Sequence, residues 1–159
     1  MAGKDRKSTG DENPVIARNR KAYHDYEILE SFEAGIQLCG TEVKSCRAHS
    51  VQLQDSFARI EQGNLIAYGI HISLYANGNR FNHQEKSPRR LLMHKKEILK
   101  LSSRVRERGF SLIPLKMYLK RGYVKVELGV ARGKTHGDKR ETLRRKQDMR
   151  EISRAVKRG

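Results

Sequence analysis

Residues 112–140 read LIPLKMYLKRGYVKVELGVARGKTHGDKR, and this stretch decides how the chain folds. Apolar residues alternate on both sides of Arg121-Gly122, which is typical of two antiparallel strands joined by a tight turn. The inward positions are predicted to be Ile113, Leu115, Met117, Leu119, Val124, Val126, Leu128 and Val130. Beyond Ala131 the apolar alternation stops. We therefore predict that a folded domain ends at Ala131 and that a basic tail begins at Arg132.

The charge of the chain indicates a polyanionic partner. Its 159 residues include 34 Lys and Arg against 18 Asp and Glu, a net charge of +16. Self-repulsion destabilises a compact protein with such an excess, and a bound polyanion offsets it. Nucleic acid is the partner that we expect, because ion pairing and counterion release then favour binding. No membrane partner is expected, since the basic segments lack the bulky apolar face of an interfacial helix.

The composition predicts one folded domain between two polar terminal segments. Residues 1–15 are expected to be a disordered leader, residues 16–131 the folded domain and residues 132–159 the tail. No apolar run reaches the roughly 20 residues of a membrane span, and the N-terminus lacks a signal-peptide stretch. Cys39 and Cys46 form no Cys-x-x-Cys pair, so we expect reduced thiols in a cytoplasmic protein.

The other periodicities favour a mainly β protein. Strands are expected over residues 26–38, with a bend at Ala34-Gly35, and over residues 51–60. A hairpin turn at 61–64 leads to a strand over 65–74, whose inward residues would be Ile66, Tyr68, Ile70 and Ile72. A polar loop is expected over residues 75–87.

Two helices are predicted among these strands. The shorter spans residues 40–47, with Thr41 as its cap. The longer is amphipathic and spans residues 87–108, beginning at Ser87-Pro88 and ending at Gly109.

The outward face of the predicted hairpin carries Lys116, Tyr118, Lys120, Tyr123, Lys125 and Glu127. Lysines can contact phosphates and tyrosines can stack on bases, which favours an RNA-binding face. The alternative is a solvated face held by cross-strand pairs.

The tail holds 11 Lys and Arg against 4 Asp and Glu. Its apolar residues Met149, Ile152 and Val156 have helical spacing but too little area to hold a helix in water. We expect disorder in the free protein and a helix when a polyanion neutralises the charges. A nonspecific basic tail is the alternative.

Motifs of catalysis are missing from the sequence. There is no phosphate-binding glycine loop, no Gly-x-Ser-x-Gly and no His-Glu-x-x-His. The six histidines have no metal-ligand spacing with a Cys or carboxylate. His24-Asp25 is expected to be a local hydrogen bond rather than an acid–base pair. We predict that the protein is not an enzyme and needs no cofactor or metal.

An ordered set of short motifs resembles one family. The motifs are AYHDY at residues 22–26, FEAGI at 32–36, GTEVKS at 40–45, DSFAR at 55–59, HIS at 71–73, GNRFNH at 78–83, RLLMHK at 90–95, VKVEL at 124–128 and DKR at 138–140. Each is weak alone, but the set is similar to the small protein B (SmpB) family of bacterial tmRNA-binding proteins, also called SsrA-binding proteins. The resemblance covers about residue 16 to the C-terminus.

The resemblance implies an antiparallel β-barrel related to the OB-fold, with helices at its ends. It implies a partner, the tRNA-like domain of tmRNA, which the protein would deliver to the A site of stalled ribosomes for trans-translation. The tail would become a helix in the empty mRNA channel and contact small-subunit rRNA at the decoding centre. We expect the protein to be a monomer.

The resemblance also implies site residues. The tmRNA-binding positions are Asn19, Lys21, His24, Glu33, Leu92 and Lys125. On the tail, Gly133 and Lys134 match a hinge, and Asp138, Lys139 and Arg140 match the element that enters the decoding region. The family commonly has an aromatic residue or histidine where this chain has Gly137. Our hypothesis is that His136 takes over its stacking role.

Two alternatives to this adaptor function remain at the level of sequence. A ribosomal structural protein or general RNA chaperone would also combine a barrel with a basic extension, and its affinity would be equally sensitive to salt. An enzyme would need a metal or a paired acid and base, which the sequence does not offer convincingly.

Overall fold

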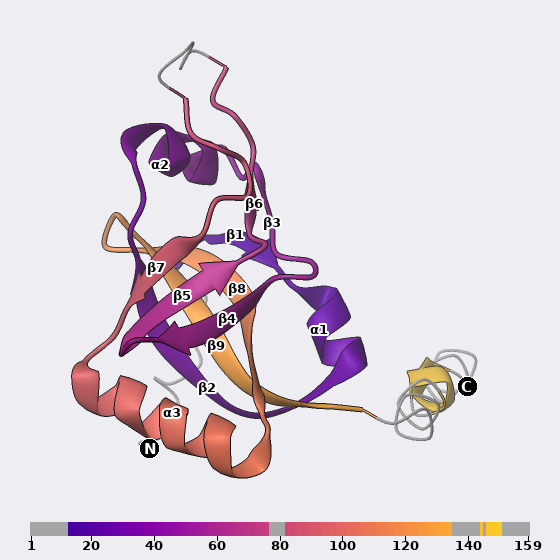
Figure 1. Cartoon of the computed structure of the whole chain (residues 1–159). Coiled ribbons are helices and arrows are strands. Elements are labelled where there is room, and N and C mark those ends of the chain that lie inside the picture. The colour runs from indigo at the N-terminus through magenta and orange to yellow at the C-terminus, as the bar shows by residue number, and fades with distance from the viewer. Residues whose placement is uncertain (1–12, 77–81, 135–143, 145, 151–159) are drawn as a thin grey trace, which may run out of the picture.

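The hairpin at residues 111–133 is the centre of an antiparallel sheet in the computed structural model, which describes residues 13–76, 82–134, 144 and 146–150 (Figure 1). The strands are β1 (Val15–Arg18), β2 (Tyr26–Ile36), β3 (Val51–Gln52), β4 (Phe57–Glu61), β5 (Asn64–Tyr68), β6 (His71–Ile72), β7 (Arg89–Leu92), β8 (Ser111–Lys120) and β9 (Tyr123–Gly133). The helices are α1 (Arg20–Asp25), α2 (Gly40–Arg47) and α3 (Lys95–Arg108).

The strands form a ring. The order in the large sheet is β1-β8-β4-β5-β7-β2-β9, and β8 pairs with β9 as well, so that the sheet returns on itself. Strands β3 and β6 make a separate small pair. Helices α2 and α3 lie at opposite ends of the ring, and α1 lies at its side (Figure 1). The expected mainly β, antiparallel and barrel-like fold is confirmed.

The turn of the hairpin is where the sequence predicts it. Arg121 and Gly122 have φ values of 53° and 81°, and Lys120 pairs with Tyr123 across them. Positive φ at both central residues matches the twist of the flanking strands.

The predicted inward face of the hairpin is only partly right. A register shift between Pro114 and Lys116 interrupts β8. Past this bulge, Met117 faces the interior of the ring, whereas Ile113 and Leu115 pack with Ala22 and Ala131 in a second cluster. A bulge inserts one residue, so side chains on its two sides change faces.

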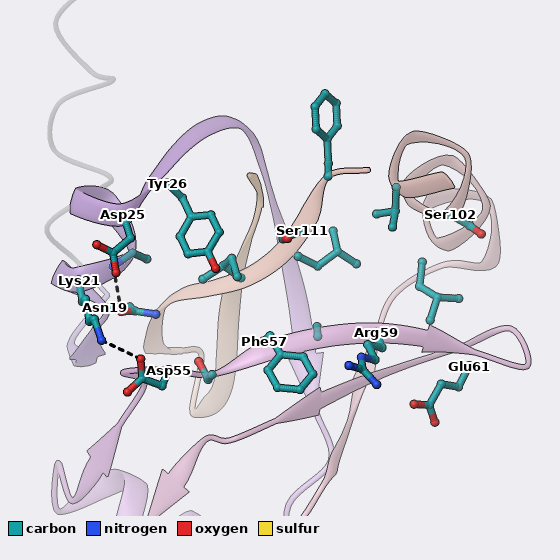
Figure 2. A pocket seen from close by; sticks show the side chains of 18 of the residues that line it. Asn19, Lys21, Asp25, Tyr26, Asp55, Phe57, Arg59, Glu61, Ser102 and Ser111 are labelled. Carbon is teal, nitrogen blue, oxygen red and sulfur yellow. Dashed lines mark hydrogen bonds and ion pairs between the residues drawn. The ribbon is translucent and has the colours of Figure 1, made fainter. Parts of the chain in front are cut away.

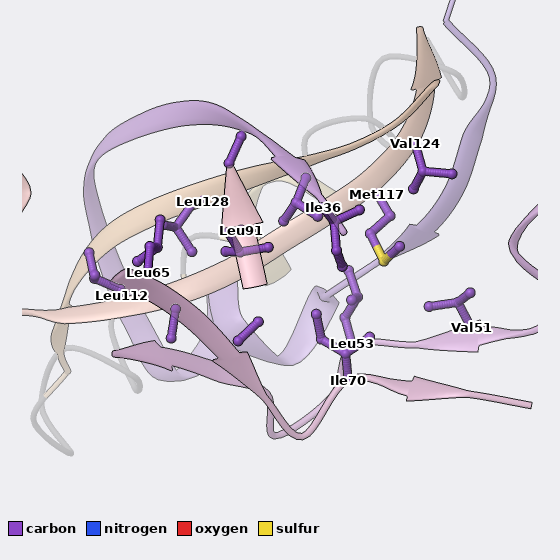
Figure 3. Close-up of a cluster of buried hydrophobic side chains, with 14 of the residues drawn as sticks. Ile36, Val51, Leu53, Leu65, Ile70, Leu91, Leu112, Met117, Val124 and Leu128 are labelled. Atoms are coloured by element: carbon purple, nitrogen blue, oxygen red, sulfur yellow. The ribbon is translucent and has the colours of Figure 1, made fainter. Parts of the chain in front are cut away.

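The main core fills the ring (Figure 3). Leu53, Leu65, Leu91, Met117 and Leu128 are each at most 1% exposed. They come from strands on all sides of the ring and from the segment after β3, so burying them requires the ring to close. Burial of such side chains stabilises the fold by about 1.5–3 kcal/mol each.

Strand β2 changes partner where the predicted bend lies. It pairs with β9 from Tyr26 to Gly35, and Gly35 also pairs with Leu92 of β7. A Cβ atom on Gly35 would lie 3.3 Å from the Cβ of Leu92, so glycine permits this close approach. The bulge itself falls between Ile28 and Glu30, not at Ala34-Gly35.

The prediction of one helix over residues 87–108 is wrong at its beginning. Residues 89–92 form β7, which lies between β5 and β2, and α3 begins only at Lys95. Arg89 and Leu91 are buried and alternate with the exposed Arg90 and Leu92. The hydrogen bonds of two neighbouring strands outweigh the local helix-start signal at Ser87-Pro88. The predicted end is confirmed, since Gly109 caps α3 with a φ of 66°.

Two further predicted strands are divided. Residues 51–60 form β3 and β4, separated by a turn in which Asp55 has a φ of 64°. Residues 65–74 form β5 and β6, separated by Gly69 with a φ of 79°.

Two details of this region differ from the prediction. The buried residues of β5 are Leu65 and Ala67, not Ile66 and Tyr68. Helix α2 is confirmed, but its cap is Cys39, whose backbone N–H donates to the Glu42 carboxylate at 3.0 Å. Thr41 is not the cap, because it lies inside the helix.

The ends of the folded part can be located. Strand β1 begins at Val15, and β9 continues past Ala131 to Gly133. In the tail, Arg144 and residues 146–150 are helical. The remaining residues of the predicted leader and of the predicted tail lie outside the described residues, so their predicted disorder stays a prediction.

Candidate RNA interface

The structure divides the six predicted tmRNA-binding residues between two places. Glu33, Leu92 and Lys125 meet where β2, β7 and β9 adjoin, since Gly35 pairs with both Leu92 and Lys125. Asn19, Lys21 and His24 belong to the start and body of α1 on another side of the ring (Figure 1). We call the first group the hairpin surface.

Glu33 is held in place on the hairpin surface. The hydroxyl of Tyr118 donates to one carboxylate oxygen, and Nζ of Lys120 lies 3.2 Å from both oxygens. The Tyr118 hydrogen bond is the main cause that lowers the pKa of Glu33, and the charges of Lys120 and Lys125 lower it further. Glu33 is therefore an oriented carboxylate that can accept a hydrogen bond from a nucleotide hydroxyl.

The predicted exposed row of Lys and Tyr is partly wrong. Tyr118 is only 8% exposed, and its hydroxyl is engaged by Glu33. Burial, followed by the Glu33 carboxylate, raises the pKa of this phenol. Tyr118 is covered on the outer face beside Glu33, so Tyr123, which is 71% exposed, is the ring of this hairpin that can stack on a base.

Lys125 is a cation available for phosphate. It is half-buried and lies opposite Tyr118 on β8. Within the described part of the chain it makes no ion pair, whereas Lys116 pairs with Glu127 and Lys120 with Glu33. Leu92 lies on β7 rather than on the predicted helix, and it is 50% exposed beside Gly35.

Asn19 holds α1 on the barrel. Its Nδ2 donates to the carbonyl oxygens of Leu53 at 3.1 Å and Pro114 at 2.9 Å, and its Oδ1 accepts from the N–H of Ala22 at 3.2 Å. It is 3% exposed. Both the nitrogen and the oxygen of this side-chain amide are engaged inside the protein. Asn19 therefore positions α1 and the cations that α1 carries.

Lys21 and His24 are accessible on α1, next to the exposed Arg20 and Tyr23. Nζ of Lys21 lies 3.0 Å from Asp55, and this hydrogen bond raises the pKa of Lys21. Nδ1 of His24 lies 2.9 Å from Asp25, which confirms the predicted local hydrogen bond. Both pairs are partly exposed.

The predicted hinge is fastened to the end of α1. Gly133 pairs with Tyr26 in the sheet, and the N–H of Lys134 donates to the carbonyl of Asp25 at 2.9 Å. Nζ of Lys134 donates to the carbonyl of Tyr23 at 3.1 Å. The tail therefore leaves the barrel beside α1. The predicted tail residues His136, Gly137, Asp138, Lys139 and Arg140 lie outside the described residues.

The structure contains a groove beside α1 that the sequence does not predict. It has a volume of about 780 Å³ and is lined by residues of α1, β4, β8 and α3, among them Lys21, Phe57, Arg59 and Ser102 (Figure 2). These residues are distant in sequence, so no local pattern could have found the groove.

The described residues carry little that suggests catalysis. Among them, no three His, Cys, Asp or Glu side chains gather in a way that could hold a metal ion. Burial raises the pKa of the Cys46 thiol to about 12, which suits a small core residue rather than a nucleophile. No helix in the described ranges is both long and apolar enough to cross a membrane.

Comparisons with known proteins agree with one another. The family model described as "SmpB protein" matches residues 16–158. An SsrA-binding protein from Carboxydothermus hydrogenoformans is 58% identical over 143 residues, which is 90% of this chain and 96% of that protein. An SsrA-binding protein from Staphylococcus haemolyticus is 53% identical over 99% of this chain and 98% of its own length.

A solved structure is similar as well. It is described as "tmRNA-SmpB: a journey to the center of the bacterial ribosome", and it superimposes with a TM-score of 0.66 at 48% identity. The match covers 83% of this chain and 96% of that one.

Proposed function

The chain belongs to the SmpB protein family, and from this membership we propose that it binds the tRNA-like domain of tmRNA and delivers it to stalled ribosomes in trans-translation. A protein of this family is an RNA-binding factor and not an enzyme. The partners are tmRNA and the ribosome.

The observation that carries the RNA-binding proposal is the hairpin surface. It combines an oriented carboxylate at Glu33, the ammonium of Lys125, which has no ion-pair partner among the described residues, and an exposed apolar side chain at Leu92. Lys125 can contact a phosphate, and Glu33 can accept from a ribose or base. A surface with both kinds of contact can prefer one folded RNA, whereas cations alone attract every RNA.

We assign the tail a separate role. Gly133 and Lys134 place the start of the tail beside α1, away from the hairpin surface. The proposal is that His136, Asp138, Lys139 and Arg140 enter the decoding centre. His136 would stack on rRNA, in place of the aromatic residue or histidine that the family commonly has at the position of Gly137. The rest of the tail would lie as a helix in the empty mRNA channel, where the RNA backbone neutralises its charges.

A competition binding assay at fixed, near-physiological salt tests the division of roles. The tRNA-like domain of tmRNA competes with bulk tRNA and an unrelated structured RNA for the full-length protein and for a protein ending at Lys134. Ending at Lys134 rather than at Ala131 keeps the Arg132–Glu27 ion pair and the pairing of Gly133 with Tyr26. We expect both proteins to prefer the tRNA-like domain and only the full-length protein to rescue stalled ribosomes.

Single substitutions test the surface. Glu33→Ala and Lys125→Ala should each weaken binding to the tRNA-like domain by about 1–3 kcal/mol. Lys96→Ala is the matched control, since it removes one lysine that is exposed on α3 and is not part of the hairpin surface. Equal binding of all three RNAs, lost on truncation, would instead indicate a general RNA-binding protein with a basic extension.

A further inference from the structure

The carboxylate of Glu33 has two lysines within reach but binds only one of them. Glu33 of β2 lies opposite Glu127 of β9, and Lys125 is two residues away along β9. Such diagonal neighbours are within reach of a long side chain, so Glu33 and Lys125 could form an ion pair. The Glu33 carboxylate instead binds Tyr118 and Lys120. Lys125 is left without an ion-pair partner among the residues that the structure describes.

The phenol of Tyr118 reaches Glu33 across a strand. Strand β9 pairs on one side with β8, which carries Tyr118, and on the other with β2, which carries Glu33. Tyr118 lies directly opposite Lys125, so its side chain extends from the level of Lys125 toward Glu33. Tyr118 is 8% exposed, and Nζ of Lys116 lies 5.4 Å from the centroid of its ring. The phenol hydroxyl is therefore held at a fixed position beside the carboxylate.

Lys120 by itself does not fix this carboxylate. The side chains of Lys120 and Glu33 are 42% and 39% exposed. An exposed ion pair contributes little, because water screens the charges and the flexible lysine loses entropy. With lysines alone, Lys120 and Lys125 would compete for Glu33 on similar terms. The nearly buried hydroxyl of Tyr118 ends this competition, and its hydrogen bond is also the largest cause that lowers the pKa of Glu33, ahead of Lys120.

We propose that Tyr118 is a positioning residue for RNA binding: its hydroxyl holds Glu33 beside Lys120 and so keeps the ammonium of Lys125 available for a phosphate. The inference rests on the proposed function, because it concerns the same surface and the same RNA. Of the two oxygens of Glu33, Oε2 accepts from Tyr118 and Lys120, whereas Oε1 accepts from Lys120 alone. Oε1 therefore has the larger remaining capacity to accept from a nucleotide hydroxyl.

Lysine labelling in the absence of RNA tests the positioning. Full-length protein reacts with limiting acetic anhydride, and mass spectrometry measures acetylation at Lys125. Tyr118→Phe should slow this acetylation several-fold, because the released carboxylate of Glu33 pairs with the ammonium and acylation needs the neutral amine. Adding Glu33→Gln should restore the rate, since an amide carries no charge. Unchanged labelling in Tyr118→Phe would overturn the proposal.

The salt dependence of RNA binding tests the consequence. The affinity of the full-length protein for the tRNA-like domain of tmRNA is measured at several salt concentrations. Loss of one phosphate contact should make the slope of log K against log salt shallower by about one. Tyr118→Phe and Lys125→Ala should each have this effect, and the two changes together should make the slope no shallower than either alone. A purely structural role of Tyr118 would leave the slope unchanged.

Tyr68→Phe is the matched control. The hydroxyl of Tyr68 donates to the carboxylate of Glu61 at 2.7 Å, so this variant removes the same kind of hydrogen bond from β5. It should change neither the labelling of Lys125 nor the slope. Thermal unfolding checks that each variant is folded.

The outcomes separate this proposal from the proposed function. Decreases in slope that add up in the double variant would show that Tyr118 and Lys125 act independently, and would overturn the positioning role. An unaltered protein that does not prefer the tRNA-like domain would contradict the proposed function. The labelling of Lys125 needs no RNA, so it would still decide whether Tyr118 keeps Glu33 away from this lysine.

Discussion

At the scale of single residues, Glu33 links stability to pH. Its carboxylate accepts from Tyr118 and Lys120, so its pKa lies below the ordinary value of 4.5. The unfolded chain takes up this proton at a higher pH than the folded one. The stabilisation is therefore complete above about pH 4.5 and is lost as the pH falls through the folded pKa.

This dependence of stability on pH predicts how the Glu33→Gln variant behaves. At about pH 7 the variant should have a lower free energy of unfolding than the unaltered protein, because the carboxylate is lost. The difference should begin to shrink below about pH 4.5, where the unfolded chain takes up the proton, and should disappear below the lower pKa of the folded protein. Urea unfolding at several pH values measures it, and a difference independent of pH would show that the carboxylate charge is not involved.

Gly129 is a second residue with a measurable role. A Cβ atom at this position would lie 2.8 Å from Cδ1 and 3.1 Å from Cγ of Leu115, which is 2% exposed in the cluster under α1. Gly129→Ala should therefore cost about 1–3 kcal/mol of stability through overpacking.

A double-mutant cycle checks the cause. Leu115→Ala alone should cost about 2–5 kcal/mol through its cavity. The two changes together should cost less than their sum, because the new methyl group occupies space that Leu115 leaves. Additive costs would place the strain somewhere other than between these two side chains.

At the scale of elements, a buried ion pair connects α2 to β7. Glu42 of α2 and Arg89 of β7 are 6% and 3% exposed, and Nε of Arg89 donates to the Glu42 carboxylate. Burial pushes the pKa of Glu42 upward, but the N–H of Cys39 and the guanidinium of Arg89 outweigh it and hold the pKa below its ordinary value. Arg89 also donates to the carbonyl of Ile70 at 2.6 Å, so the pair fastens α2 onto the ring.

Removing one partner should be costlier than removing both. Arg89→Met leaves the Glu42 charge buried without its cation and should cost about 3–5 kcal/mol. Adding Glu42→Gln should recover part of that loss, since a neutral amide can remain near the N–H of Cys39. Chemical unfolding of the two variants measures the difference. A double variant less stable than Arg89→Met would contradict this account.

At the scale of the whole molecule, charge is divided between barrel and tail. Residues 135–159 contain 9 Lys and Arg and 4 Asp and Glu, so they carry +5 of the +16, and residues 1–134 carry +11. Because the tail leaves beside α1, it is separated from the hairpin surface. We therefore expect the tail to attract unrelated RNA through its charge, whereas the barrel alone binds the tRNA-like domain.

The salt dependence of binding tests this division. For an unrelated RNA, the protein ending at Lys134 should show a shallower slope of log K against log salt than the full-length protein, because fewer counterions are released. For the tRNA-like domain the two slopes should be nearly equal. A large decrease in slope for the tRNA-like domain would place the tail on that RNA.

The sequence by itself determined the hairpin, its turn at Arg121-Gly122, helix α2, the end of α3 at Gly109 and the basic character of the tail. These features depend on neighbours along the chain: alternation, positive φ at a turn and local charge. Only the tertiary structure decided that residues 89–92 are a strand, that Tyr118 faces Glu33, and that Asn19 is buried. Each depends on partners far away in the sequence, such as β5 and β2 for β7, and no local pattern encodes which distant strand supplies the hydrogen bonds or fills the space.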